Sequence, residues 1–142
     1  MNLFESVLAM FAVLFFTTIS MVYNRGAWDQ TRRLHDANAF VQASQLCHSV
    51  LDEVDAKLFS KQLSFAGVKT TFNTTHTLNL AHVGDIYTLT VTAVDCDSLG
   101  VPLSTPVTNN IYTVVSVTAN TSSGLKHPVT LRRIYTKTHL NL

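Results

Sequence analysis

The first 22 residues, "MNLFESVLAMFAVLFFTTISMV" (1–22), carry one charged side chain, Glu5, in an apolar run that extends to Tyr23. Residues 6–23 contain no charge and no proline, and their length reaches the ~17 to 25 residues that a helix needs to span a bilayer. An ionisable side chain is costly in lipid and is usually kept there for a function. We therefore predict a membrane-spanning helix in which Glu5 has a specific role.

This N-terminal run differs from a cleaved secretory signal. No basic segment precedes it, and no small-x-small cleavage motif closes it. Arg25, Arg32 and Arg33 follow the run, and such basic residues usually mark the cytoplasmic side of a span. Taken alone, this rule places the C-terminal domain in the cytoplasm. Removal of a basic leader before Met1 would reconcile the charges with the opposite orientation.

Residues 24–60 continue the helical pattern without a proline. The whole helix would be roughly 85 Å long at about 1.5 Å per residue, so its hydrophobic half is expected to project. The β-branched residues from Thr17 and the glycine at position 26 predict a bend or local melting between them. Apolar side chains recur at the spacing of one helix face, and this stripe consists of Leu34, Phe40, Val41, Cys47, Leu51, Val54 and Leu58.

After Gly67 the periodicity changes to two, which is typical of strands with one buried face. Residues 86–94 and 111–119 show the clearest alternation, and 129–137 is less regular. Residues 68–74 are a weaker fourth strand or a strand-like loop. Turn-forming residues separate these segments, so the order is a long helix followed by an antiparallel meander.

The sequence therefore predicts an α+β fold, with a bipartite N-terminal helix and a small antiparallel sheet as its head. Residues 1–25 are the hydrophobic helix, 26–60 the amphipathic helix packed on the head, and 61–142 the β head domain. A small sheet must bury one face, and the apolar stripe is the only large surface available to cover it.

The two cysteines, Cys47 and Cys96, have neither C-x-x-C spacing nor a haem-attachment motif. Cys47 lies on the stripe that faces the sheet, and Cys96 follows a predicted strand. In an oxidising compartment we expect a single disulfide between them, contributing roughly 4 kcal/mol in the chain-entropy model. Two separate buried thiols remain the alternative.

Composition and motifs argue against several functions. The net charge is +1, which is no electrostatic signature of a nucleic-acid binder. No P-loop, Rossmann or nucleophile-elbow glycine pattern is present. We expect no enzymatic activity, no metal site and no cofactor, since the histidines are scattered singly at His35, His48, His76, His82, His127 and His139.

Two groups of surface residues are weaker candidates for a site. Asn73 and Asn120 each begin an N-x-Ser/Thr glycosylation pattern. Basic residues near the C-terminus are more typical of a solvated strand edge than of a DNA-binding surface, so nucleic acid is not an expected partner. These basic residues are Lys126, Arg132, Arg133 and Lys137.

The N-terminal stretch "MNLFESVLAMFAVLFFTTISMVYNR" (1–25) resembles the type IV pilins and their pseudopilin relatives. The resemblance lies in the apolar first residue, the Glu at position five and the charge-free run, and the helix-then-meander order extends it along the chain. It implies a prepilin whose leader is removed by a prepilin peptidase, with N-methylation of Met1. Val22 stands where many pilins have a helix-breaking proline.

This resemblance implies a structural subunit of an extracellular filament. In a stack of identical helices, Glu5 of one subunit would pair with the Met1 amine of a neighbour inside an apolar core. The apolar helix would first anchor a single-pass precursor in the inner membrane, and the assembly machinery would then extract it. Adhesion, motility or DNA uptake would be properties of the filament surface.

Two other functions remain open. A minor pseudopilin of a type II secretion-like system would share Glu5 but act at the tip or base of a short fibre. A monomeric single-pass domain that binds a ligand through its sheet would have no use for Glu5.

Overall fold

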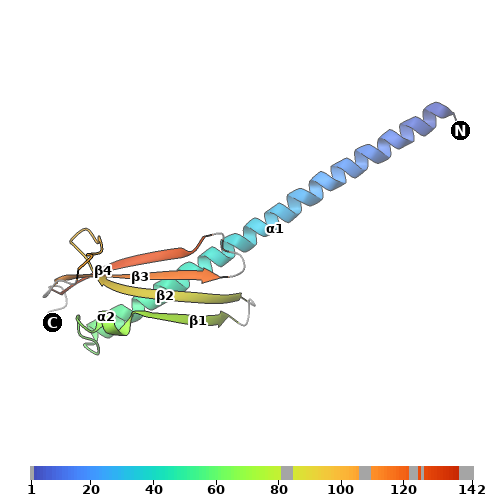
Figure 1. Ribbon diagram of the computed structural model, residues 1–142. Helices are drawn as coiled ribbons and strands as arrows, with labels where there is room; N and C mark the ends of the chain where they lie inside the picture. The colour runs from blue at the N-terminus through green and yellow to red at the C-terminus, as the bar shows by residue number, and fades with distance from the viewer. Residues whose placement is uncertain (1, 81–84, 106–109, 122–124, 126, 138–142) are drawn as a thin grey trace. The chain divides into compact units, whose positions relative to one another are not determined.

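The computed structural model describes residues 2–80, 85–105, 110–121, 125 and 127–137 (Figure 1). Its elements are α1 (Leu3–Phe59), α2 (Val68–Thr71), β1 (Thr74–Leu80), β2 (Asp85–Asp95), β3 (Tyr112–Thr121) and β4 (Val129–Thr136). The long N-terminal helix and the four-stranded antiparallel sheet confirm the predicted α+β class. The chain divides into two units at the boundary between Ala37 and Asn38, and α1 contributes to both.

In the first unit, α1 is an unbroken helix, so the local melting expected between Thr17 and Gly26 does not occur. The Thr17 hydroxyl donates to the carbonyls of Val13 and Leu14, both at 2.9 Å, and the Thr18 hydroxyl donates to Leu14 at 2.7 Å. These bonds satisfy both hydroxyls within the helix. Because no proline interrupts the backbone ladder, the β-branched residues and the glycine lower helix propensity without ending the helix.

In the second unit, the strands form a meander in the order β1-β2-β3-β4, and the C-terminal part of α1 packs on one face of this sheet (Figure 1). We call this face the inner face. Inner-face residues of the two central strands are almost fully buried against the helix. They include Tyr87, Leu89, Val91 and Ala93 on β2, and Val115, Val117 and Ala119 on β3.

The predicted apolar stripe is only partly correct. Cys47, Leu51, Val54 and Leu58 are buried, whereas Leu34, Phe40 and Val41 are exposed. Ala39 and Ala43 face the sheet instead. The large Tyr87 side chain explains this choice, because its hydroxyl donates to Gln42 Oε1 at 3.0 Å and to the Ala39 carbonyl at 3.4 Å. A small residue lets the helix backbone approach that ring.

The weakest strand prediction, for residues 68–74, is wrong. Val68–Thr71 form the short helix α2, and the first strand is Thr74–Leu80. Val68 and Phe72 are buried whereas Thr70 is exposed, which fits a helix, because in a strand all three side chains would lie on one face. The sequence of β1, "TTHTLNL", has no regular apolar alternation, because this edge strand is largely exposed.

The loop after β2 returns to the face of the sheet opposite α1, which we call the outer face. The Asp97 carboxylate accepts hydrogen bonds from the amides of Leu99 and Val101, at 2.9 and 2.8 Å, and so closes a tight turn. Gly100 lies in this turn with φ +80°, and a Cβ atom there would lie 2.7 Å from Ile134 Cδ1 on β4. The backbone conformation therefore favours glycine, and a larger residue would also push the Ile134 side chain aside.

Gly100→Ala is expected to lower the free energy of unfolding by about 1–3 kcal/mol, because alanine is strained at positive φ and its methyl group displaces Ile134. Urea unfolding of the full chain in detergent micelles, followed by circular dichroism, measures the change. Gly26→Ala is the matched control, since a Cβ there meets nothing within 4 Å and alanine favours a helix. An equal loss in both variants would contradict this account of Gly100.

Candidate functional site

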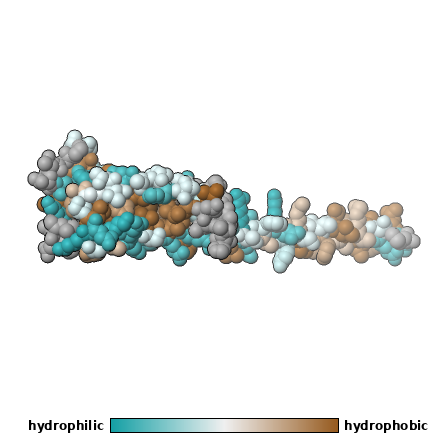
Figure 2. All heavy atoms as spheres, turned by 90° about the horizontal axis from the view of Figure 1, so that it is seen from below, coloured by the Kyte–Doolittle hydropathy of each residue, from teal (hydrophilic) through white to brown (hydrophobic). Residues whose placement is uncertain are grey.

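The apolar segment, residues 3–23 of α1, exposes its large side chains along the whole of its length. Figure 2 shows hydrophobic atoms along much of this part of the helix. The most apolar 18-residue window of α1 has a mean hydropathy of 2.0, and none of it is buried. By length and composition, α1 is therefore able to cross a membrane. Side chains this apolar need an environment other than water.

Glu5 lies in the first turn of α1 and contacts the residue that caps the helix. The Asn2 carbonyl accepts hydrogen bonds from the Glu5 and Ser6 amides, at 2.9 and 3.2 Å. In return, the Asn2 amide donates to Glu5 Oε2 at 3.2 Å. This is the reciprocal half of a capping box, in which an acid at the third helical position bonds back to the capping residue. A carboxylate at this end also interacts favourably with the helix dipole.

The capping contact leaves Glu5 able to take part in a second interaction. Oε1 accepts no hydrogen bond from any residue that the structure describes. Met1, the partner expected in a neighbouring subunit, lies outside the described residues. The geometry therefore gives Glu5 a role within its own helix, and it is compatible with an additional ion pair at the exposed oxygen.

Polar contacts fix the C-terminal part of α1 to the sheet. The Arg133 guanidinium pairs with Asp55 and lies 3.2 Å from Asp52 Oδ1. The Tyr135 hydroxyl donates to the Leu51 carbonyl at 3.3 Å. Burial, with a smaller contribution from neighbouring Asp55, raises the pKa of Tyr135, so the phenol stays neutral and keeps its donor. These contacts and the buried apolar face hold this part of the helix on the head.

The basic residues near the C-terminus do not form one surface. Arg132 is exposed on the outer face of β4, whereas Arg133 points inward to the helix carboxylates. Lys137 is exposed just after β4, and Lys126 lies outside the described residues. Because two adjacent arginines face opposite sides of the sheet, they cannot together contact one phosphate backbone.

The two glycosylation candidates have different surroundings. Asn73 connects α2 to the sheet: its Nδ2 donates to the carbonyls of Lys69 and Ala93, at 2.7 and 3.3 Å, and its Oδ1 accepts from the Ala93 amide at 2.7 Å. A sugar on Nδ2 would disturb these bonds. Asn120 is exposed on the outer face of β3, opposite Thr88, although the last residue of its motif is not described.

The expected Cys47–Cys96 disulfide is not formed, and both residues are buried free thiols. Cys47 does face the sheet, and its Sγ lies 3.8 Å from the Val129 carbonyl, beside Ala119 of β3. The Cys96 amide instead donates to the carbonyl of Tyr112, at the opposite end of β3. Residues 112 and 119 lie about 23 Å apart along an extended strand at ~3.3 Å per residue. A disulfide requires Cα atoms within about 7 Å, so these thiols cannot pair in this fold.

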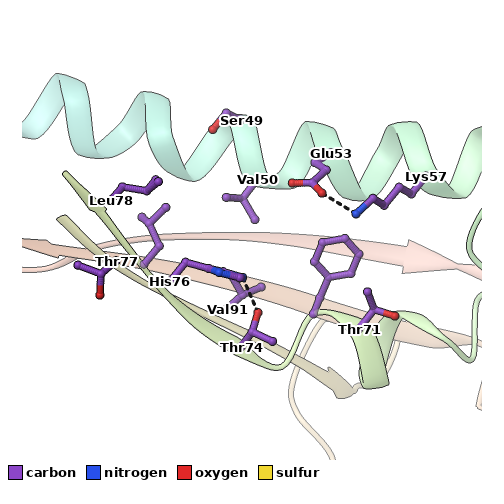
Figure 3. A pocket seen from close by; sticks show the side chains of 12 residues that line it. Ser49, Val50, Glu53, Lys57, Thr71, Thr74, His76, Thr77, Leu78 and Val91 are labelled. Carbon is purple, nitrogen blue, oxygen red and sulfur yellow. Dashed lines mark hydrogen bonds and ion pairs between the residues drawn. The ribbon is translucent and has the colours of Figure 1, made fainter. Parts of the chain in front are cut away.

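A groove of about 640 Å³ lies between α1 and β1 (Figure 3). Four strands spaced ~4.8 Å apart are wider than one helix, about 10 Å across, can cover. Here α1 covers β2, β3 and β4 and leaves the inner face of β1 open, where Leu78 is 40% exposed. The groove is lined mainly by Val50, Phe72, Leu78, Leu89 and Val91, with Ser49, Thr71, Thr74, Thr77, His76, Glu53 and Lys57 adding polar groups.

The charges at this groove neutralise each other. Lys57 Nζ lies 2.6 Å from Glu53 Oε1 and 5.3 Å from the centre of the Phe72 ring. His76 Nε2 is 2.8 Å from the Thr74 hydroxyl (Figure 3). The site thus presents an apolar floor with hydroxyl groups and a neutral ion pair, and it offers no cluster of like charges to a charged ligand.

Sequence reasoning missed this groove, because its residues come from α1, α2, β1 and β2 and share no motif. The one sequence feature that could have indicated this groove was the absence of charged residues from segment 74–80. Within the described residues, no three histidine, cysteine, aspartate or glutamate side chains lie together as metal ligands, and His82 and His139 are outside that part of the chain. No family model, curated protein or solved structure matches this chain.

Proposed function

We propose that this chain is a structural subunit of an extracellular, type IV pilus-like filament that polymerises through the apolar segment of α1. The observation that carries this proposal is the exposed helical surface of residues 3–23, which begins with a single carboxylate at Glu5. A stack of such helices would remove this surface from water, and this burial would stabilise the stack by about 25 cal/mol per Å² of apolar area.

The position of the charge favours a register-specific stack. An unpaired carboxylate in an apolar core is costly, whereas one paired with the N-terminal amine of a neighbour costs much less. This contact joins two different surfaces of identical subunits, and repetition of such an interface builds an open helix rather than a closed ring. Before assembly, the same segment would hold the precursor in the inner membrane as a single span.

The resemblance to type IV pilins supports a role for a prepilin peptidase and a pilus assembly machinery. A prepilin peptidase would release and N-methylate Met1, and methylation would keep the positive charge that Glu5 requires. The second unit would then form the filament surface, where adhesion, motility or DNA uptake would take place. A short fibre of a type II secretion-like system would use the same Glu5 contact.

The proposal is tested with the processed full chain, purified in detergent. Gradual removal of the detergent is expected to yield thin filaments of uniform diameter in negative-stain electron microscopy, because the apolar segment loses its micelle. Monodisperse particles or amorphous aggregates under all detergent-removal conditions would contradict it.

One observation favours a second candidate function. The groove between α1 and β1 suits a membrane-anchored domain that binds a ligand, and such a protein would not need the Glu5 contact. The two functions are separable, because binding at the groove would persist in a subunit that cannot polymerise.

A further inference from the structure

Strand β1 forms one edge of the sheet. It pairs with β2 along its whole length, from Thr74–Val91 to Leu80–Asp85, and no described strand pairs with its other side. An unpaired edge presents a row of backbone N–H and C=O groups that can accept another extended chain. Strand β4 forms the opposite edge of the same sheet.

The two edges differ in how they are protected. Proteins commonly prevent unwanted pairing with charged side chains or proline on the edge strand. Strand β4 carries Arg132 and Arg133 within "VTLRRIYT". Strand β1, "TTHTLNL", contains no Lys, Arg, Asp, Glu or Pro over its seven residues. The charges that would discourage pairing are thus present on one edge and missing from the other.

The groove lies on the inner side of this unprotected edge. Val50 projects from α1 toward the sheet, and Leu78 and His76 rise from β1 below it (Figure 3). A chain added alongside β1 would continue the sheet, and every second side chain would point to the inner face, next to this apolar floor. Its other side chains would continue the outer face, where Thr75, Thr90, Thr118 and Thr130 form one row across the four strands.

We propose that β1 and the adjoining groove bind an extended peptide segment of a partner protein by strand addition. The partner segment is uncharged and carries apolar side chains at alternate positions. Backbone hydrogen bonds to β1 supply affinity, and the groove selects the inward side chains. The neutral Glu53–Lys57 pair gives a charged segment no advantage. This inference does not depend on filament formation, since Glu5 has no part in it.

The test uses the full chain in detergent micelles and a fluorescein-labelled, end-capped peptide of alternating threonine and valine, seven residues long to match β1. Fluorescence anisotropy is expected to show saturable binding. Hydrogen–deuterium exchange should show new protection at residues 74–80. A peptide with the same composition but its valines grouped together, and one N-methylated at alternate backbone nitrogens, are each expected to bind at least about tenfold more weakly.

Leu78→Lys should weaken binding at least about tenfold, because it places a charge at the groove on the edge strand. Ile86→Lys is the matched control, because Ile86 is 48% exposed, against 40% for Leu78, but lies on the outer face of β2. The affinity of this variant for the peptide should stay within about twofold of wild type. Glu5→Ala should also bind normally.

Three outcomes of the peptide experiments would overturn the proposal. These are no saturable binding up to about 1 mM peptide, equal binding of the grouped-valine peptide, and protection that falls outside β1 and the groove. Cross-linking that detects dimers joined through β1, with no peptide binding, would also overturn it in favour of self-association. Circular dichroism confirms that each variant is folded.

Discussion

Glu5→Ala is expected to reduce filament yield at least about 100-fold, because each subunit added would bury a neighbour's N-terminal ammonium group without a countercharge, at a cost of about 3–5 kcal/mol. The measurement is the amount of protein that sediments as filaments after detergent removal, with electron microscopy of the pellet. Asp29→Ala is the matched control, because Asp29 is an exposed carboxylate on the same helix, outside the apolar segment. It should assemble like the wild type.

Glu5→Gln separates the two roles that the structure allows for this residue. Glutamine also accepts the hydrogen bond from the Asn2 amide, so it preserves the helix cap while removing the charge. If pairing with a neighbouring amine drives assembly, Glu5→Gln should fail almost as completely as Glu5→Ala. Normal assembly of Glu5→Gln would show that Glu5 acts only as a cap, and the proposed ion pair would be wrong.

The fold class was predictable because its signals are local. The change from helical spacing to a period of two locates the long helix and the three more regular strands, and the structure places all of them in those parts of the chain. Strand β1 was misplaced because an exposed edge strand does not need apolar alternation. Val68 and Phe72 are four residues apart and would share one face in either a helix or a strand, so their spacing in the sequence did not distinguish the two.

The position of α1 along the strands was harder to predict than which face of each element is buried. Periodicity showed that Cys47 faces the sheet, which is correct. It carried no information on the position of the helix along the strand direction, and this position keeps the two thiols apart. Contacts between residues far apart in the sequence determine this position, such as the Tyr87–Ala39 hydrogen bond and the Arg133–Asp55 ion pair. No local sequence pattern encodes such contacts.

The candidate sites follow the same division. Glu5 stands out in the sequence because it is the one charge in an apolar run. The groove depends on which strand the helix leaves uncovered, so only the folded arrangement places Val50 beside Leu78. A lone charge in an apolar run is visible to sequence reasoning, whereas a surface assembled from four elements is not.

Both thiols are expected to resist alkylation in the folded protein and to react fully once it is unfolded. Cys47 and Cys96 are fully buried, and burial raises the pKa of each thiol, which lowers the reactive thiolate fraction at pH 8. Iodoacetamide should modify them at least about 100-fold more slowly than in guanidinium chloride, since labelling requires local opening. Intact mass spectrometry should then find two adducts per chain without any reductant.

Ser49→Cys supplies the positive control, because Ser49 is exposed on the same helix, two residues from Cys47. This added thiol should react in the folded protein at close to the rate of a free cysteine. Samples are prepared without reductant, so any disulfide made during expression is retained. If the unfolded wild type takes up no label until dithiothreitol is added, the cysteines are bonded. The helix would then have to sit about 20 Å from its place along the strands. Such a shift would also separate Arg133 from Asp55, so the thiol count tests the helix–sheet register as well as the disulfide.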